Sequence, residues 1–374
     1  MPSDSWLGWA TLPFVVACGS AGVSHEERTT TTSAPAVPPP RSERIVSGFT
    51  SAPDIAPPLN AAAPDLPTSL ACENDVGHAV ELYCTGLYAR WPSLRLAVDV
   101  KEYDPGLHLW SDGADKRRFI WLPPGKLIDT SDMNDWVFPI GTKVWKEFSL
   151  SGRRVETRYL EKLTDGTWFR TTYAWSDDET GATELVSGAA NVRGTSYEIP
   201  TQQECTTCHK GRRDGVLGFE AIALASPDAS GVTLQKLVDA HLVTNPPAAR
   251  LDVPGNAQEK AALGWLHMNC GVPCHNRNAS SEAGFTGLEM RLLAEDLEAV
   301  QTTDAWRTAV GVQAYFQPVE GLVFFRIAPR NVAQSLIPYR DGNRTNPRIQ
   351  MPPIATHVVD ANGLAAVKAW IEGM

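Results

Sequence analysis

The sequence predicts a multidomain α+β protein in which a β-rich domain precedes an α-helical domain. Seven of the twelve tryptophans lie between residues 91 and 175, where apolar and polar residues alternate as they do in strands. Beyond residue 256 the apolar residues recur at helical spacing instead, and helix-capping residues precede them. With the N-terminal region set aside, about 300 residues remain, which is enough for two substantial cores.

Residues 1–18 resemble a bacterial lipoprotein signal peptide. The apolar run 12–17 ends in Cys18, which Gly19 and Ser20 follow, although no basic residue precedes the run. In such signals the cysteine becomes the lipidated N-terminus after cleavage. The resemblance therefore implies lipidation at Cys18 and attachment to a membrane through the lipid anchor. Because Gly19 and Ser20 after the cysteine include no retention-type aspartate, it also implies a periplasm-facing lipoprotein of the outer membrane.

Residues 19–67 are expected to form a disordered tether. The segment is rich in Thr, Ser, Ala and Pro and has almost no aromatic residues, a composition that does not support a packed core. Such a tether would let the folded part stand off the membrane and reach its partners. No run of about 18 apolar residues follows, so the sequence predicts no membrane-spanning helix.

Residues 68–200 are predicted to form a β-sandwich or a small barrel. Apolar and polar residues alternate over 155–159 and over 169–175. The turn signals Ser151-Gly152 and Asp165-Gly166 separate the alternating runs. We therefore expect consecutive hairpins in this domain.

The β-rich domain also holds a candidate disulfide and a charged segment. Cys72 and Cys84 lie close together in the sequence and suit a disulfide bond if the compartment is oxidising. The segment 109–118 groups two carboxylates and three basic residues around a glycine. We interpret it as a charged turn with local ion pairs, and a catalytic role is the alternative.

The motif Cys205-Thr206-Thr207-Cys208-His209 carries the clearest chemical signal in the chain. Two thiols and an imidazole at this spacing are what covalent attachment of a c-type haem requires. Each thiol adds to one haem vinyl group, and the histidine becomes the proximal iron ligand. A first haem-binding segment is therefore predicted over residues 201–255. A redox-active Cys-x-x-Cys pair and half of a zinc site are the alternatives.

A second cluster, at Cys270, Cys274 and His275, has three residues between its cysteines instead of two. A wider loop can still present both thiols to the vinyl groups of a haem. A helix is predicted just before the cluster, over residues 256–269, because Asn256 and Glu259 form a capping-box pair and apolar residues recur on one face. The helix would position the cluster beside the haem.

Residues 256–374 resemble a class I cytochrome c domain. After the helix and the haem motif, Met351 lies in a proline-stiffened segment, and a closing helix is predicted from about 360 to 372. The resemblance implies that His275 is the proximal ligand and Met351 the distal ligand of a second haem c, and that the closing helix crosses the first one. The extra residue between the cysteines departs from the family pattern. A disulfide within the cluster or a Cys/His metal site is the alternative, and Met351 would then be an ordinary apolar residue.

Residues 95–374 also resemble a family of bacterial two-haem proteins of the periplasm or outer membrane. The likeness depends on the residues at 109–114, on Ile199-Pro200 ahead of the first motif, and on the run from Trp265 to Cys270 at the second. It implies an architecture and a content of two haems, and it implies no particular reaction.

The sixth ligand of the first haem is left open by the sequence. No Met or His follows the first motif at the position where a complete class I domain would place it. We favour His267 or Met268, and the other candidates are Met290, His241 and His108. If none of these binds, the iron is five-coordinate and can take up peroxide or another small oxidant.

The leading hypothesis is an exported di-haem c-type cytochrome that transfers single electrons between redox partner proteins. One alternative is a two-haem enzyme of the peroxidase type, with an open first haem. Another is a surface-binding lipoprotein whose Trp-rich β domain binds a ligand. The net charge is −10, from 43 acidic and 33 basic residues, so nucleic acid is not an expected partner.

Overall fold

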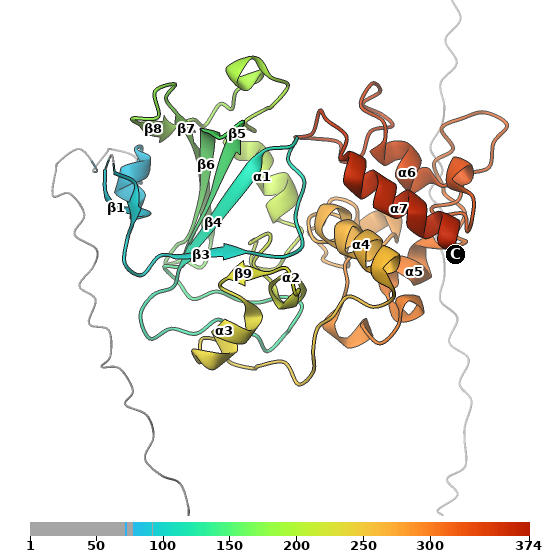
Figure 1. Cartoon of the computed structure of the whole chain (residues 1–374), viewed down its shortest axis with the longest axis horizontal. Helices are drawn as coiled ribbons and strands as arrows, with labels where there is room; N and C mark the ends of the chain where they lie inside the picture. The colour runs from blue at the N-terminus through green and yellow to red at the C-terminus, as the bar shows by residue number, and fades with distance from the viewer. Residues whose placement is uncertain (1–71, 73–77, 92) are drawn as a thin grey trace, which may run out of the picture. The chain divides into compact units, whose positions relative to one another are not determined.

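The computed structural model of the chain describes residues 72, 78–91 and 93–374 (Figure 1). The predicted signal peptide with Cys18, and the predicted tether at 19–67, lie outside the described residues. By chain packing, the described residues belong to one compact unit. No helix in the described part is long and apolar enough to cross a membrane.

The β-rich part contains a seven-stranded antiparallel sheet with the strand order β8-β7-β6-β5-β4-β3-β9 (Figure 1). Its strands are β3 (Lys101–Asp104), β4 (Asp115–Trp121), β5 (Lys143–Leu150), β6 (Arg153–Lys162), β7 (Trp168–Trp175), β8 (Ala182–Glu184) and β9 (Ser230–Gly231). The predicted α+β class is confirmed. The strand order does not return on itself, so these seven strands form an open sheet and not a closed barrel. From β3 to β8 each strand pairs with the one before it in the chain, and β9 pairs with β3 at the other edge of the sheet.

The predicted turns connect the long central strands. At the β5–β6 turn, Ser151 and Gly152 both have positive φ, at 49° and 76°. This conformation matches the right-handed twist of the two strands that it joins. The β6–β7 turn contains Gly166, whose φ is 83°.

A small N-terminal layer covers one face of the sheet. It consists of η2 (Leu82–Thr85), β1 (Tyr88–Arg90) and β2 (Arg95–Leu96), and β1 pairs with β2. Alternate strand residues point toward it, and their side chains are buried in a common cluster: Phe119, Trp145, Tyr159 and Tyr173. The alternation seen in the sequence therefore separates two faces of the sheet.

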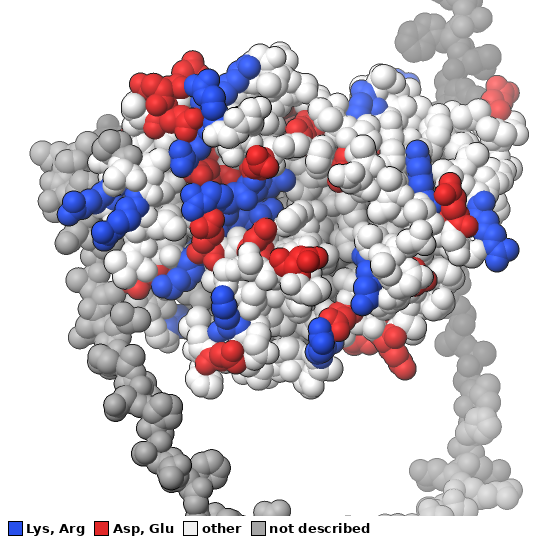
Figure 2. Space-filling view, in the orientation of Figure 1, with Lys and Arg blue, Asp and Glu red and all other residues white. Residues whose placement is uncertain are grey.

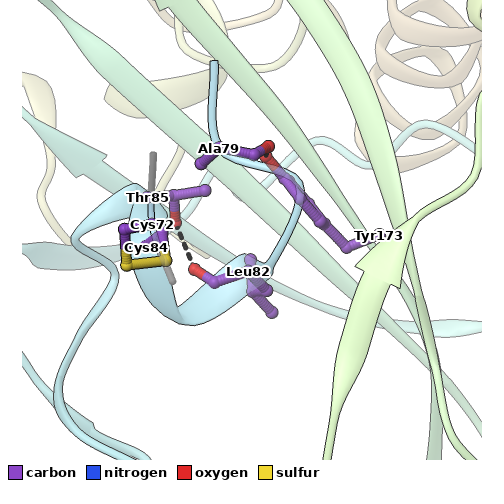
Figure 3. The surroundings of a disulfide bond; sticks show 6 residues. All are labelled: Cys72, Ala79, Leu82, Cys84, Thr85 and Tyr173. Carbon is purple, nitrogen blue, oxygen red and sulfur yellow. Dashed lines mark hydrogen bonds between the residues drawn. A yellow bond between two sulfur atoms is a disulfide. The ribbon is translucent and has the colours of Figure 1, made fainter. Parts of the chain in front are cut away.

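A disulfide bond joins Cys72 to Cys84 at η2, with the two Cα atoms 5.4 Å apart (Figure 3). Tyr173 from β7 points toward the same layer, and its hydroxyl donates a hydrogen bond of 2.7 Å to the Ala79 carbonyl oxygen. The disulfide and this hydrogen bond secure the start of the described chain against the sheet.

The opposite face of the sheet shares a core with the helices. Ile120, Val144 and Leu160 from the central strands lie in the same buried cluster as Leu263 and Ile371, which are helical. Burial of these side chains joins the β-rich and helical parts. A cavity described below lies between the two parts.

The helical region consists of short elements. The helices are α1 (Gln202–His209), α2 (Ala221–Ala225), α3 (Leu234–Asp239), α4 (Ala257–Leu266), α5 (Asp304–Ala309), α6 (Leu336–Asp341) and α7 (Ala361–Gly373). A π-helical turn, η4 (His267–Gly271), continues α4, and the 3-10 turns are η3 (Val192–Gly194), η5 (Gly284–Thr286), η6 (Ala294–Asp296), η7 (Val300–Thr302) and η8 (Val332–Gln334).

The two helices expected to frame the second cluster are present and contact each other. Asn256 and Glu259 form the predicted capping box at the start of α4. Trp265 near the end of α4 donates a hydrogen bond of 2.7 Å to Asp360, the N-cap of α7. A Cβ atom at Gly363 would collide with the Trp265 indole, so glycine permits the close approach of α7 to α4.

Candidate functional site

The first Cys-x-x-Cys-His motif is carried by α1. Thr201 and Glu204 form a capping box that starts this helix immediately before the motif. Cys205, Cys208 and His209 all line one cavity of about 1610 Å³, its open mouth included. The sequence prediction that these three side chains act together is therefore compatible with their placement.

His209 is prepared to bind a metal ion through its second ring nitrogen. Its Nδ1 lies within hydrogen-bond distance of the Gly215 carbonyl oxygen, so Nδ1 carries the proton and Nε2 has the free lone pair. Burial lowers the pKa of His209 to about 3, and repulsion from Arg170 adds to the effect. The ring is therefore neutral at physiological pH. A backbone carbonyl that orients a histidine is a common feature of metal sites.

The sheet contributes a row of basic side chains to this cavity. Arg118 is directly opposite Lys146 on the neighbouring strand, and Lys146 is directly opposite Arg158. Like charges at such positions destabilise a sheet. Arg118 pairs with Asp104 at 2.8 Å and Arg158 with Glu156 at 2.7 Å, whereas within the described residues Lys146 has no acidic partner.

Lys146 is held in an unfavourable environment. Burial, followed by repulsion from Arg118 and Lys116, keeps the pKa of Lys146 well below its usual range. Both Lys146 and Arg158 line the cavity. Figure 2 shows basic and acidic side chains side by side over the sheet in a chain of net charge −10. A cation without an acidic partner at a cavity is suited to an anionic group of a ligand.

The second cluster lies on a π-helical turn. The backbone N–H of His275 donates to the Cys270 carbonyl oxygen at 2.7 Å, and that of Val272 donates to His267 at 2.7 Å. Both bonds span five residues rather than the four of an α-helix. The extra residue between Cys270 and Cys274 is accommodated in this wider turn. His275 therefore stands one turn after Cys270, as the histidine of an ordinary motif does on an α-helix.

A second cavity, of about 520 Å³, brings together three of the predicted residues. Cys270, His275 and Met351 line it, together with Leu288 and Met290. Burial lowers the pKa of His275 to about 4, so its imidazole is also neutral at physiological pH. The proximal and distal ligands inferred from the class I resemblance thus face one apolar cavity, although they are far apart in the sequence.

Cys274 has a different placement. It lines the first cavity with Cys205 and Cys208, and it is not among the residues that line the second. Interaction with the Cys274 thiol lowers the pKa of Cys208. The two cysteines of the second cluster therefore face different cavities.

The two cavities share a wall. Trp265, Asp341 and Pro352 line both of them. Burial raises the pKa of Asp341 to about 7, and its Oδ2 atom has no hydrogen-bond partner. Groups bound in the two cavities would be separated by little more than these side chains.

The sixth-ligand candidates do not face the first cavity. His267 is fully buried, but its Nδ1 accepts from the Leu292 N–H at 2.9 Å and its Nε2 lies 3.4 Å from Glu220. Met268 is buried in a small apolar cluster. The described residues that line the first cavity include one histidine, His209, and no methionine. The placement thus supports neither His267 nor Met268 as the ligand. The other candidates lie elsewhere: Met290 in the second cavity, His241 on the surface, and His108 exposed beside Asp104.

The charged segment 109–118 has a positioning role that its sequence did not reveal. Asp112 accepts hydrogen bonds from the backbone N–H groups of His357 and Val358, at 2.8 Å and 3.0 Å. It thereby ties the β-rich part to the loop that follows Met351. Nothing in the local pattern of charges indicates a partner so distant in the chain.

Comparison with known proteins returns no match: no family model, curated protein or solved structure is similar to this chain. In the described part of the chain, no group of three or more His, Cys, Asp or Glu side chains is arranged to hold a metal ion directly. Each of the two cavities offers one neutral histidine and at least one cysteine among mainly apolar side chains.

Proposed function

We propose that this protein is a two-haem c-type cytochrome that transfers single electrons between redox partner proteins. The observation that carries the proposal is that Cys270, His275 and Met351 line the second cavity together. The first cavity, which Cys205, Cys208 and His209 line, is next to it. A Cys/His/Met set in an apolar cavity is typical of electron-transfer cytochromes.

The roles of the side chains follow from their positions. Haem supplies the one-electron exchange. Cys205 and Cys208 would form thioethers to the haem of the first cavity, and Cys270 to the haem of the second. His209 and His275 would offer a neutral nitrogen to the iron of the first and the second haem, respectively. Lys146, in the row of cations, would attract the haem carboxylates of the first cavity.

Met351 would provide the second axial ligand in the second cavity. A thioether sulfur stabilises the reduced iron and raises its reduction potential. The first cavity lacks such a ligand in the described residues, so electrons would move through the shared wall and rest on the second haem. Trp265 is the aromatic part of this wall.

The test is the haem content of the protein produced in a host that matures c-type cytochromes. Intact mass and the pyridine haemochrome should both give two covalent haems per chain. The double variant Cys205→Ala/Cys208→Ala should retain one haem, which makes it a matched control for the second cavity. A wild-type chain without covalent haem would refute the proposal.

A second candidate function is a reaction of a small oxidant such as peroxide at the first haem. The absence of a methionine and of a second histidine among the described residues lining that cavity favours it. The reduced protein should then bind one carbon monoxide per chain, and peroxide should oxidise it rapidly. If both irons are low-spin and bind no carbon monoxide, the protein is an electron carrier without this activity. No described tryptophan is fully exposed, so no observation favours ligand binding by the β-rich part.

The proposed location is the outside of the cytoplasmic membrane, where c-type haem is attached in bacteria. The Cys72–Cys84 disulfide supports an oxidising compartment. Lipidation at Cys18 and a tether over 19–67 would hold the protein at the outer membrane. Replacement of Cys18 by Ser should release the protein from the membrane fraction without changing its haem content.

A further inference from the structure

The two cysteines of the second cluster line different cavities. Cys270 faces the second cavity with His275 and Met351, whereas Cys274 faces the first cavity with Cys205 and Cys208. Two thioethers to one haem require both thiols to reach the same porphyrin. This arrangement brings only one thiol of the cluster to the second cavity.

The backbone holds Cys274 on its side of the wall. The Cys274 carbonyl oxygen accepts hydrogen bonds from the Ser281 hydroxyl and from the Ala283 N–H. The preceding residue, Pro273, lies so close to Gly211 that a Cβ atom at Gly211 would collide with the Pro273 carbonyl. Gly211 follows α1 directly, so the Pro273–Cys274 backbone is packed against the end of the first haem helix.

We propose that the haem of the second cavity is attached through a single thioether at Cys270, and that Cys274 remains a free thiol at the first cavity. This inference rests on the proposed function and refines it. The π-helical turn keeps His275 correctly placed relative to Cys270, so that ligation by His275 does not depend on Cys274.

Formation of the thioether at Cys270 requires neither an oxidant nor a reductant. The Cys270 S–H bond breaks, the sulfur bonds to one carbon of a vinyl group, and the hydrogen is added to the other carbon. The second vinyl group of that haem stays unsaturated and conjugated with the porphyrin. Its pyridine haemochrome band should therefore lie at a longer wavelength than that of a haem with two thioethers.

The sequence offers a direct test. Cleavage after Lys260 and Arg277 releases a peptide that contains Cys270, Cys274 and no other cysteine. The full-length protein is denatured without reductant, alkylated with iodoacetamide and digested with trypsin. We expect the peptide to carry one haem and one alkyl group, with the alkyl group on Cys274, and to show the band at longer wavelength.

Each other outcome overturns the inference in a recognisable way. A peptide with haem and no alkyl group has two thioethers, and a peptide alkylated at Cys270 has its haem on Cys274. A peptide with two alkyl groups and no haem removes the second haem of the proposed function as well. The Cys274→Ser variant is the matched control: it should keep two covalent haems and an unchanged spectrum, while Cys270→Ser should lose one covalent haem.

Discussion

At the scale of single residues, burial keeps two imidazoles neutral, as the proposed iron ligation requires. A histidine must be neutral to coordinate, and competition with protons weakens a site whose pKa is high. Burial lowers the pKa of His209 to about 3 and that of His275 to about 4. Both rings are therefore free of a proton on one nitrogen throughout the physiological range.

Replacement of Met351 tests the distal ligand of the second cavity. In Met351→Ala, the sulfur-to-iron absorption band near the red end of the spectrum should disappear, and one midpoint potential should fall by on the order of 100 mV because the thioether ligand is lost. The measurement is a spectroelectrochemical titration. Met290→Leu is the control, because Met290 is a second methionine lining the same cavity. An unchanged spectrum in Met351→Ala would remove Met351 from the mechanism.

At the scale of elements, the wide turn from Cys270 to His275, which continues from η4, determines how the second cluster is presented. An α-helical turn would place His275 on a different side of the helix from the histidine of an ordinary motif, because one more residue stands between the cysteines. The bond from the His275 N–H to the Cys270 carbonyl oxygen, at 2.7 Å, widens the turn by that residue. The wider turn thus compensates for the extra residue between Cys270 and Cys274.

Glu220 joins two of these elements, and its titration should affect stability. It is the N-cap of α2, and its carboxylate lies 3.4 Å from His267 in η4. Burial alone would raise the pKa of Glu220, but His267, Arg212 and the Ala223 N–H together lower it to about 2. A carboxylate whose pKa is lower in the folded state stabilises the fold above its unfolded pKa. This contribution is lost as the pH falls through the folded value.

The expected loss is on the order of 3 kcal/mol between pH values of roughly 4.5 and 2. In Glu220→Gln this acid-sensitive step should be missing from the free energy of unfolding, measured by denaturant titration at several pH values. Glu298→Gln, an exposed change, should keep the wild-type slope. Equal slopes for all three proteins would show that Glu220 does not titrate in this way.

At the scale of the whole molecule, the sheet and the helices complete one cavity that neither contains alone. Val144 and Lys146 reach it from the sheet, Cys208 and His209 from α1, and Trp265 from α4. The chain is acidic as a whole, yet the sheet directs a row of cations at this cavity. Of this row, Lys146 and Arg158 line the cavity, where acidic side chains such as Glu204 and Glu282 also face it.

Replacement of Lys146 should change the midpoint potential of the first haem only. The carboxylates of a bound haem would favour the charged form of Lys146, and a positive charge near a haem disfavours its oxidised form. Lys146→Met should therefore lower the midpoint potential of the first haem by on the order of 50 mV. The potential of the second haem should change much less. Lys126→Met, at an exposed position, is the control. If neither potential moves in Lys146→Met, the cation row does not act on the haem.

Much of the arrangement was predictable because its signals are local. The capping box at Asn256 and Glu259 predicted the start of α4, and the turn at Ser151-Gly152 predicted a hairpin. The alternation from Val155 to Tyr159 predicted a strand with two distinct faces. The sandwich or barrel was not predictable in the same way, since alternation describes one strand and says little about which edges meet.

The sequence by itself determined the chemistry that is available: two Cys-His motifs, a methionine far downstream, and the helices and strands that carry them. The tertiary structure alone decided that Cys270 and Cys274 face different cavities, that His267 is engaged by Glu220, and that Asp112 holds the loop after Met351. The physical reason is that spacing along the chain constrains only near neighbours. The face on which a side chain emerges, and the distant residue that it meets there, depend on how all the elements pack together.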